Sequence, residues 1–349
     1  MPLITPAALT AFSNALFVAA GVPAEAADMV SRSLVGANLR GYDSHGVMRL
    51  PFYIGAIQDG RVNPTAALAI EKETPAAIVA DGGWGLGQAL CHDLLGRLIH
   101  KAKTTGIACG TLRRAAHIGR LGEYAEAAAE QGLALILIAN SHGSGLRVAP
   151  VGGTRGRLGT NPLCIGIPGG QNGPFVLDFG TSATAEGKVR VKKIAGESVP
   201  LGWILDANGN PSTNPNDLYG NPPGSILPMG GDQAYKGFGL AYMIELLTGG
   251  FSGGQCSFAT APPPVGNCVM MQVLDPDLFA GAAHLREEVQ KLEAFTRATP
   301  LKAGVEKVTL PGDPERALAA SRLAGIPLDD GNWSALLKLA TDLKVTPPV

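Results

Sequence analysis

The fold is decided by residues 76–139, which read AAIVADGGWGLGQALCHDLLGRLIHKAKTTGIACGTLRRAAHIGRLGEYAEAAAEQGLALILIA. Short apolar runs at 77–80, 107–112 and 133–139 alternate with longer alanine-rich stretches at 86–104 and 119–131. The short runs suit buried strands, and the longer stretches have the length of helices. Because strands that alternate with helices pack as layers around a sheet, this section predicts an α/β fold.

Both ends of the chain have helical patterns instead. We expect helices near 6–20, 23–40 and 51–58, and again near 281–299, 314–324 and 331–343. Thr5 followed by Pro6 suits a helix start, and Asp329 or Asp330 suits the start of the last helix. Two helical ends around an α/β centre predict an outer helical domain built from 1–75 plus 275–349 and a central domain at 76–274.

The rest of the central section is mostly strand and loop. Apolar runs at 163–167, 175–179 and 202–205 are separated by Gly, Pro and Asn clusters that are typical of turns. A helix near 235–248 and a strand at 268–274 follow.

Composition excludes several classes of partner. The 28 basic and 29 acidic residues are mixed along the 349-residue chain, so no basic stripe predicts binding to nucleic acid. No apolar run reaches the ~20 residues that a membrane span needs. The five cysteines are widely spaced and form no CxxC pair, which favours reduced thiols in the cytoplasm.

One motif looks like a dinucleotide fingerprint and fails. The strand at 77–80 enters a loop in which Gly83, Gly85 and Gly87 make GxGxG, whereas the fingerprint needs its last glycine at position 88, which is Gln. The next strand, at 107–112, ends without the acidic residue that would bind a ribose hydroxyl. We therefore expect a tight strand-to-helix turn and a fold unlike the Rossmann fold.

The loop Asp43-Ser44-His45-Gly46 is the strongest candidate for chemistry. A carbonyl that accepts a hydride needs a proton donor, and histidine, with a pKa of about 6.5, suits that role. Arg49 follows closely, and its planar guanidinium can hold a carboxylate by two parallel hydrogen bonds. A satisfied surface histidine is the alternative interpretation of His45.

A second group of polar residues precedes the helix at 119–131. His117 follows a strand, and Gly119 and Arg120 stand at the helix start, where free N–H groups can bind an anion; a capping histidine explains the pattern equally well. The segments 159–162 and 178–182 are polar turns beside strands. Lys236 opens a helix at a point where an anion would be attracted.

Taken in order, these segments resemble the malate/L-lactate dehydrogenase family of the second type, whose members are NAD(P)-dependent 2-hydroxyacid dehydrogenases without a Rossmann fold. The resemblance covers nearly the whole chain. It rests on the motifs GYDSHGVMRLPFY (41–53), AAHIGRLGEYAE (115–126), GGTRGRLGTNP (152–162), LDFGTSATAEGK (177–188), WILDANGNPSTNP (203–215), YKGFGLAYMIELLTGGFSGG (235–254) and LPGDPE (310–315).

The resemblance implies a mixed-sheet cofactor domain at 76–274 that binds NAD or NADP, and a homodimer with its active site near the subunit interface. It implies His45, Ser44 and His117 as catalytic residues, with His45 as proton donor, and a substrate site at Arg49, Tyr53 and Thr160. The cofactor residues that it implies are His117, Ile118, Gly119, Arg120, Leu121, Asp178, Gly180, Thr181, Ser182, Lys188, Lys236, Pro311, Gly312 and Asp313.

The chain departs from the family pattern at two points. Ala115 and Ala116 stand where the family usually has Ser-Asn, and Tyr235 stands where it often has His. Both departures concern polar contacts around the nicotinamide and the substrate tail, and they leave the reaction type unchanged.

Three other functions remain to be compared with this one. Within the family, the alternative is an NADPH-dependent reductase of cyclic imino acids or keto sugar acids. A metal-dependent hydrolase would need close ligands, and His92 and His100 lie about two helical turns apart, so we expect no metal site. A non-catalytic protein that binds the cofactor is the third.

Overall fold

The structure, a computed structural model, describes residues 1–259 and 266–348. Its centre is a seven-stranded sheet with the strand order β2-β3-β4-β11-β5-β6-β7. The strands are β2 (Ala69–Glu73), β3 (Ala77–Gly85), β4 (Ile107–Ala115), β5 (Ala134–Asn140), β6 (Pro162–Ile167), β7 (Phe175–Gly180) and β11 (Asn267–Leu274).

The sheet is mixed, as the sequence predicts. Strands β3 and β4 run parallel and are joined by helix α4 (Gly87–Thr105), whereas β11 lies antiparallel between β4 and β5. A Rossmann sheet has parallel strands at its centre, so this arrangement confirms the predicted non-Rossmann α/β class.

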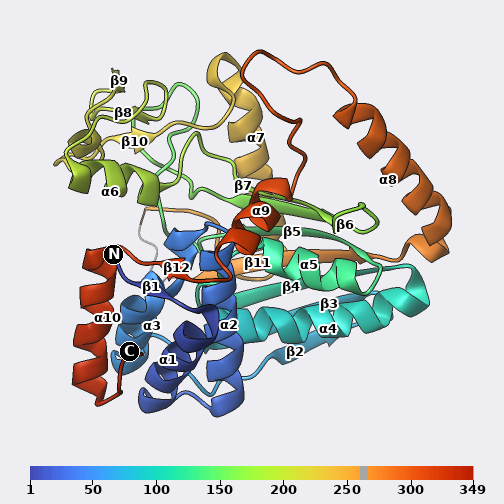
Figure 1. Cartoon of the computed structure of the whole chain (residues 1–349), viewed down its shortest axis with the longest axis horizontal. Helices are drawn as coiled ribbons and strands as arrows, with labels where there is room; N and C mark the ends of the chain where they lie inside the picture. Colours follow the sequence, from blue (N-terminus) through green and yellow to red (C-terminus); the bar gives the residue numbers. More distant parts are fainter. Residues whose placement is uncertain (260–265, 349) are drawn as a thin grey trace.

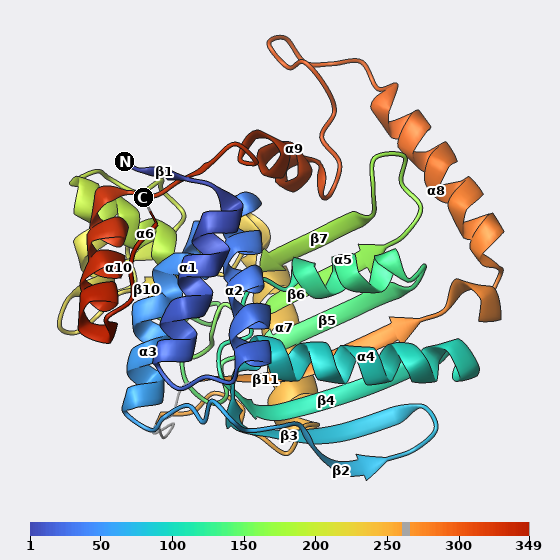
Figure 2. The same cartoon turned by 60° about the horizontal axis from the view of Figure 1, so that its bottom comes forward.

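Helices cover both faces of the sheet. Figure 2 shows α4 and α5 (Gly122–Glu130) on one face and α7 (Ala234–Glu245) on the other. The largest core of buried side chains lies between the sheet and helices α4 and α5, and includes Leu94, Leu98, Leu112 and Tyr124. This core fixes the end of β4 and the start of α5, and the predicted site residue His117 lies in the segment between them.

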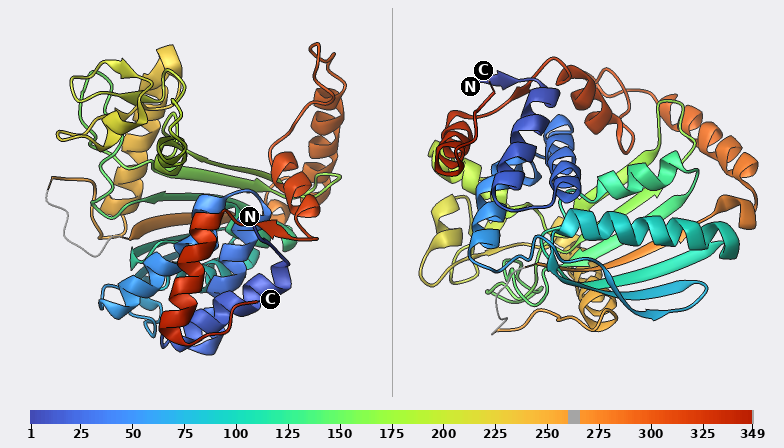
Figure 3. Two further views of the ribbon diagram at one scale, coloured as in Figure 1. Left: turned by 60° about the vertical axis from the view of Figure 1, so that its left-hand side comes forward. Right: turned by 90° about the horizontal axis from the view of Figure 1, so that it is seen from below.

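A second core joins the two ends of the chain. It is shared by α1 (Pro6–Ala19), α2 (Ala24–Leu39), α3 (Leu50–Gln58) and α10 (Asp330–Leu343), and strand β1 (Leu3–Ile4) pairs with β12 (Ile326–Pro327). Both termini lie beside this helical group (Figures 1 and 3). Thr5 and Asp329 cap α1 and α10, as the sequence predicts.

The remaining C-terminal helices lie elsewhere. Helix α8 (Ala282–Arg297) stands at the far end of the sheet, away from α10, and α9 (Asp313–Ser321) lies between the two (Figure 2). The division into 1–75 plus 275–349 and 76–274 stays a prediction, because contacts within one folded chain do not test which part folds alone.

A third, smaller core contains α6 (Glu186–Ala195), an α-helix that the sequence patterns miss. It packs near the short strands β8 (Ile204–Leu205), β9 (Pro211–Ser212) and β10 (Ser225–Ile226). Val189 is the one buried residue of α6. Glycine and charged residues fill most of the α6 sequence, EGKVRVKKIA, so no apolar run marks it as an element. Within the described part of the chain, no helix is long and apolar enough to cross a membrane.

Candidate active site

The loop with the predicted proton donor forms two short 3₁₀ turns, Asp43–His45 and Val47–Arg49, which lead directly into α3. The side chain of Asn38 in α2 holds this loop, since it donates to Asp43 and accepts from the N–H of Val47. Ser44 Oγ lies 3.0 Å from Nδ1 of His45. The imidazole is therefore oriented by its own neighbour in the chain.

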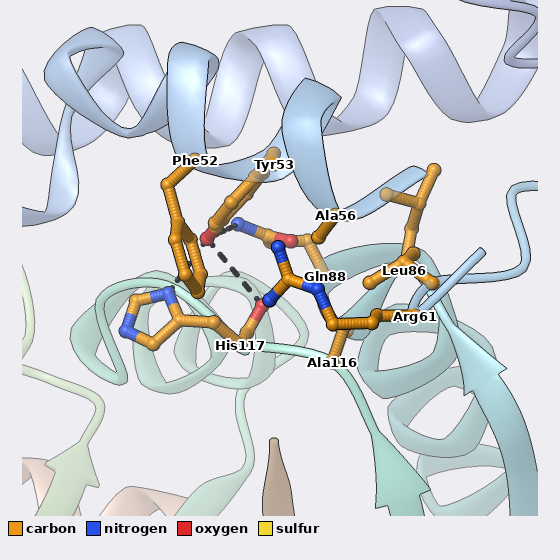
Figure 4. Close-up of a pocket in the computed structure, with 10 residues that line it drawn as sticks. Phe52, Tyr53, Ala56, Arg61, Leu86, Gln88, Ala116 and His117 are labelled. Atoms are coloured by element: carbon orange, nitrogen blue, oxygen red, sulfur yellow. Dashed lines mark hydrogen bonds between the residues drawn. The ribbon is translucent and has the colours of Figure 1, made fainter. Parts of the chain in front are cut away.

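His117 follows the end of β4, and its ring lies next to the ring of His45. The centroids of the His45 and His117 rings are 5.4 Å apart. The hydroxyl of Tyr53 lies 2.6 Å from Nδ1 of His117, and Nε2 of Gln88 lies 3.0 Å from that hydroxyl (Figure 4). The helical group and the sheet thus each supply one histidine.

The surroundings keep both histidines neutral. Burial, and then the charges of Arg49 and Arg120, lower the pKa of His45 to about 4. Burial, followed by Arg49 and His45, lowers the pKa of His117 well below its usual value. An anion bound nearby would offset these positive charges and raise both pKa values.

Arg49 completes this group. Its Nε donates to the backbone oxygen of Ser44 over 2.6 Å, which turns the guanidinium toward the 43–46 loop. Among the described residues no carboxylate lies within ion-pair distance of Arg49. Since a partly buried guanidinium is costly without an anionic partner, the group is suited to bind an external carboxylate.

A pocket of about 230 Å³ is lined by Tyr42 and by three predicted cofactor residues, Arg120, Asp178 and Gly312. The Arg120 side chain is 1% exposed and pairs with Glu126, and its Nε and one Nη have no hydrogen-bond partner. Two orphaned guanidinium nitrogens are a donor set for an anionic group. The pocket is also lined by the carboxylates of Glu126, Glu130, Asp178 and Glu315, so its lining is of mixed charge and offers acceptors for hydroxyl groups as well as donors.

Asp178 and Tyr42 connect this pocket to the histidines. The N–H of Gly122 donates to Asp178 over 2.8 Å, and burial raises the pKa of Asp178 to about 6. The Tyr42 hydroxyl lies 3.3 Å from both the backbone oxygen of Asp178 and Glu315, and its ring packs edge-on to His45. Tyr42 therefore forms the wall between the pocket and His45.

The other predicted residues lie at different distances from this centre. Thr160 and the Gly180–Ser182 turn pack together, with the N–H of Thr181 donating to the oxygen of Thr160 over 2.9 Å. Lys188 is exposed on α6, whose Gly187 packs against Ser44. Lys236 is exposed in the first turn of α7. Pro311 and Asp313 flank Gly312, and Asp313 pairs with Arg297 and Arg316.

The failed GxGxG motif has a packing role. A Cβ on Gly87 would lie 2.3 Å from the oxygen of Ala116 and 2.5 Å from that of His117. Glycine at this position therefore lets α4 approach the segment that carries His117. Among residues 1–259 and 266–348, no group of three or more His, Cys, Asp or Glu side chains gathers as a metal site would require.

Sequence reasoning missed two buried side chains that support the site. Gln88 lies in α4 and reaches His117 through Tyr53. Glu245 in α7 accepts hydrogen bonds from Asn140, Asn161 and Ser257, and so ties the end of β5 and the start of β6 to α7. Gln88 lies outside the family motifs quoted above. Glu245 lies inside the motif at 235–254, where a carboxylate in an apolar run is itself a signal, since a buried charge needs partners.

The sequence profile of malate/L-lactate dehydrogenase matches residues 4–337. Hydroxycarboxylate dehydrogenase B of Escherichia coli K12 is 36% identical over 340 residues, covering 96% of this chain and 92% of that protein. The L-lactate dehydrogenase of Cupriavidus necator is 36% identical over 341 residues, covering 95% of each.

Solved structures agree with these relatives. Malate dehydrogenase from Pyrococcus horikoshii superposes with a TM-score of 0.90 at 30% identity, covering 99% of this chain and 97% of the other. Delta1-piperideine-2-carboxylate reductase from Pseudomonas syringae has a TM-score of 0.82 at 30% identity, covering 97% and 100%. The profile and the relatives extend over nearly the whole chain, and the protein belongs to the malate/L-lactate dehydrogenase family.

Proposed function

We propose that this protein is an NAD(P)-dependent dehydrogenase that interconverts a small 2-oxo acid and its 2-hydroxy acid. The observation that carries the proposal is the meeting of His45, His117 and the guanidinium of Arg49, which has no carboxylate partner among the described residues, next to the pocket lined by Arg120 and Asp178. The relatives, which are hydroxycarboxylate, lactate and malate dehydrogenases, support the same reaction type.

Each residue has a role that follows from its chemistry. Arg49 binds the carboxylate of the substrate and fixes the adjacent carbonyl. His45, oriented by Ser44, gives a proton to the carbonyl oxygen during reduction and takes it back during oxidation. Thr160 remains a proposed substrate contact, and the predicted substrate residue Tyr53 is proposed to act on the substrate through His117, which its hydroxyl contacts.

For the cofactor we propose the pocket beside Tyr42. Arg120, Asp178 and Gly312 would hold it, together with the Gly180–Ser182 turn and the His117–Leu121 segment. When bound, the reduced nicotinamide supplies the hydride to the carbonyl carbon, and the proton comes from His45. Both NAD and NADP stay in the proposal.

The alternative substrate is a cyclic imino acid, because the same hydride and proton delivery reduces a C=N bond. The likeness to delta1-piperideine-2-carboxylate reductase favours including it. The deciding experiment is a panel of 2-oxo acids, keto sugar acids and cyclic imino acids, each with NADH and NADPH and followed by loss of reduced-nicotinamide absorbance. Turnover of imines alone would replace the oxo-acid proposal, and cofactor binding without any turnover would contradict both.

The pKa of His45 predicts the pH dependence of oxidation. Because the free chain holds this pKa at about 4, the neutral base already dominates at neutral pH. We expect kcat/KM for the hydroxy acid to be steady near neutral pH and to fall only as the pH drops through about 4. The measurement is a kcat/KM profile at constant ionic strength, with circular dichroism to verify folding. A midpoint near the ordinary value of 6.5 would contradict the burial argument.

Lys236 is proposed to assist the binding of cofactor phosphate or ribose, because it lies in the first turn of α7, where helix N–H groups and the dipole attract anions. Lys236→Ala should raise the cofactor KM more than the substrate KM. Steady-state kinetics with each ligand varied in turn measure both, and Lys338→Ala on α10 serves as the control. An unchanged cofactor KM would remove Lys236 from the site.

We also propose a homodimer. Exposed apolar side chains support it: Tyr242, Met243 and Phe251 in and after α7, and Leu292 and Phe295 in α8, are all more than half exposed. Burying such surface against a second copy would be favourable. Sedimentation velocity at assay concentration should show a dimer, and a fully active monomer would refute the proposal.

A further inference from the structure

The hydrogen bonds around His117 have a defined direction. Its Nδ1 lies 2.6 Å from the Tyr53 hydroxyl and 3.3 Å from the backbone N of Gly119. The Tyr53 hydroxyl in turn lies 3.0 Å from Nε2 of Gln88, which is fully buried (Figure 4). The position of the proton on the ring can therefore be derived from its partners.

Two contacts set the direction together. The backbone N–H of Gly119 can only donate, so it favours a lone pair on Nδ1, but at 3.3 Å it is the weaker contact, and the 2.6 Å contact from Tyr53 is the stronger one. The amide of Gln88 donates to the Tyr53 oxygen, which leaves the single phenolic proton for Nδ1. If the phenolic proton did not point to Nδ1, its remaining acceptor would be the backbone oxygen of His117, which lies at the longer distance of 3.4 Å.

The charge state agrees with this direction. Burial raises the pKa of Tyr53, so the phenol keeps its proton. Burial and nearby positive charge lower the pKa of His117, so its ring is neutral. A neutral imidazole that accepts at Nδ1 carries its one proton on Nε2.

We propose that His117 acts as a neutral imidazole whose Nε2–H is a fixed hydrogen-bond donor to the bound acid, and that Gln88 is the positioning residue that sets this tautomer through Tyr53. The identity of the acceptor rests on the proposed function, whereas the tautomer does not. A fixed neutral donor gains strength as negative charge develops on a substrate oxygen, and it needs no reorganisation during the reaction.

This assignment separates the two histidines. Nδ1 of His45 faces a serine hydroxyl, which can either donate or accept, so His45 can hold or release a proton during turnover. Nε2 of His117 already carries a proton while Nδ1 accepts two hydrogen bonds, so the ring cannot serve as the base at Nε2. The proton transfer therefore belongs to His45 and the fixed donor role to His117.

The test is ¹⁵N NMR of the chain labelled at its six histidines, with the His117 signals assigned from His117→Gln. In the wild type at neutral pH we expect a pyridine-type Nδ1 and a pyrrole-type Nε2. In Gln88→Met, which keeps the side-chain length but cannot donate, the signals should move toward a mixture of tautomers. Gln58→Met, at an exposed position of α3, should leave them unchanged.

Two further measurements make the result decisive. Tyr53→Phe keeps the ring and removes only the hydroxyl, so it should also lose the fixed tautomer even if Gln88→Met does not fold. In Gln88→Met the KM for the oxo acid should rise about five- to tenfold, the effect of one weakened hydrogen bond, with an unchanged cofactor Kd.

Distinct outcomes overturn the proposal. A pyrrole-type Nδ1 or a doubly protonated ring in the wild type would overturn the tautomer assignment, and a folded Gln88→Met with wild-type His117 signals would overturn the role of Gln88. Because the NMR signals need no substrate, failure of every oxo acid to react would count against the proposed function and not against the tautomer.

Discussion

His45→Ala should lower kcat for oxo-acid reduction by ~10²–10⁴, the range typical of general acid catalysis. The imidazole is set beside Ser44 and close to His117, and its interaction with the carbonyl oxygen strengthens as that oxygen becomes charged. Removing an interaction of this kind lowers kcat more than it raises KM. Cofactor binding should stay intact, because the pocket with Arg120 and Asp178 lies beyond Tyr42.

The measurement is steady-state kinetics in the reducing direction, with circular dichroism as the folding control and NADH fluorescence for cofactor binding. His100→Ala is the matched control, since it removes an exposed histidine of α4. A folded His45→Ala enzyme with near wild-type kcat would refute the mechanism, and His117 would then become the leading candidate for the proton donor.

Arg49→Lys should raise the KM for the oxo acid roughly ten- to a hundredfold, the cost of one charge-assisted hydrogen bond. Lysine keeps the charge and loses the planar fork that holds a carboxylate by two parallel bonds. It also loses the bond from Nε to the backbone oxygen of Ser44, which helps to hold the 43–46 loop. A lower kcat should accompany the higher KM, because the carbonyl is then misplaced relative to His45.

Kinetics with the oxo acid varied at saturating cofactor test this expectation. Arg32→Lys, at an exposed position of α2, is the control for a conservative arginine change. An Arg49→Lys enzyme with an unchanged KM would exclude Arg49 as the carboxylate anchor.

The sequence by itself determined the kind and order of most elements. The apolar runs at 77–80, 107–112 and 133–139 became β3, β4 and β5, and the caps Thr5 and Asp329 start α1 and α10. These features follow from periodicity and capping, which depend on residues a few positions apart. The long motifs, in their order along the chain, also indicate the family, and the family profile confirms it.

Only the tertiary structure decided which segments meet. Strand β11 enters the sheet between β4 and β5, although it follows β5 by more than a hundred residues, and no local pattern encodes that position. The Tyr53–His117 contact joins residues 64 apart, and Tyr42 reaches Glu315 from 273 residues away. The direction of the proton on His117 depends on Gln88 and Gly119, which belong to different segments. Local propensity sets helices and strands, whereas a site depends on packing between distant segments, which only the folded core fixes.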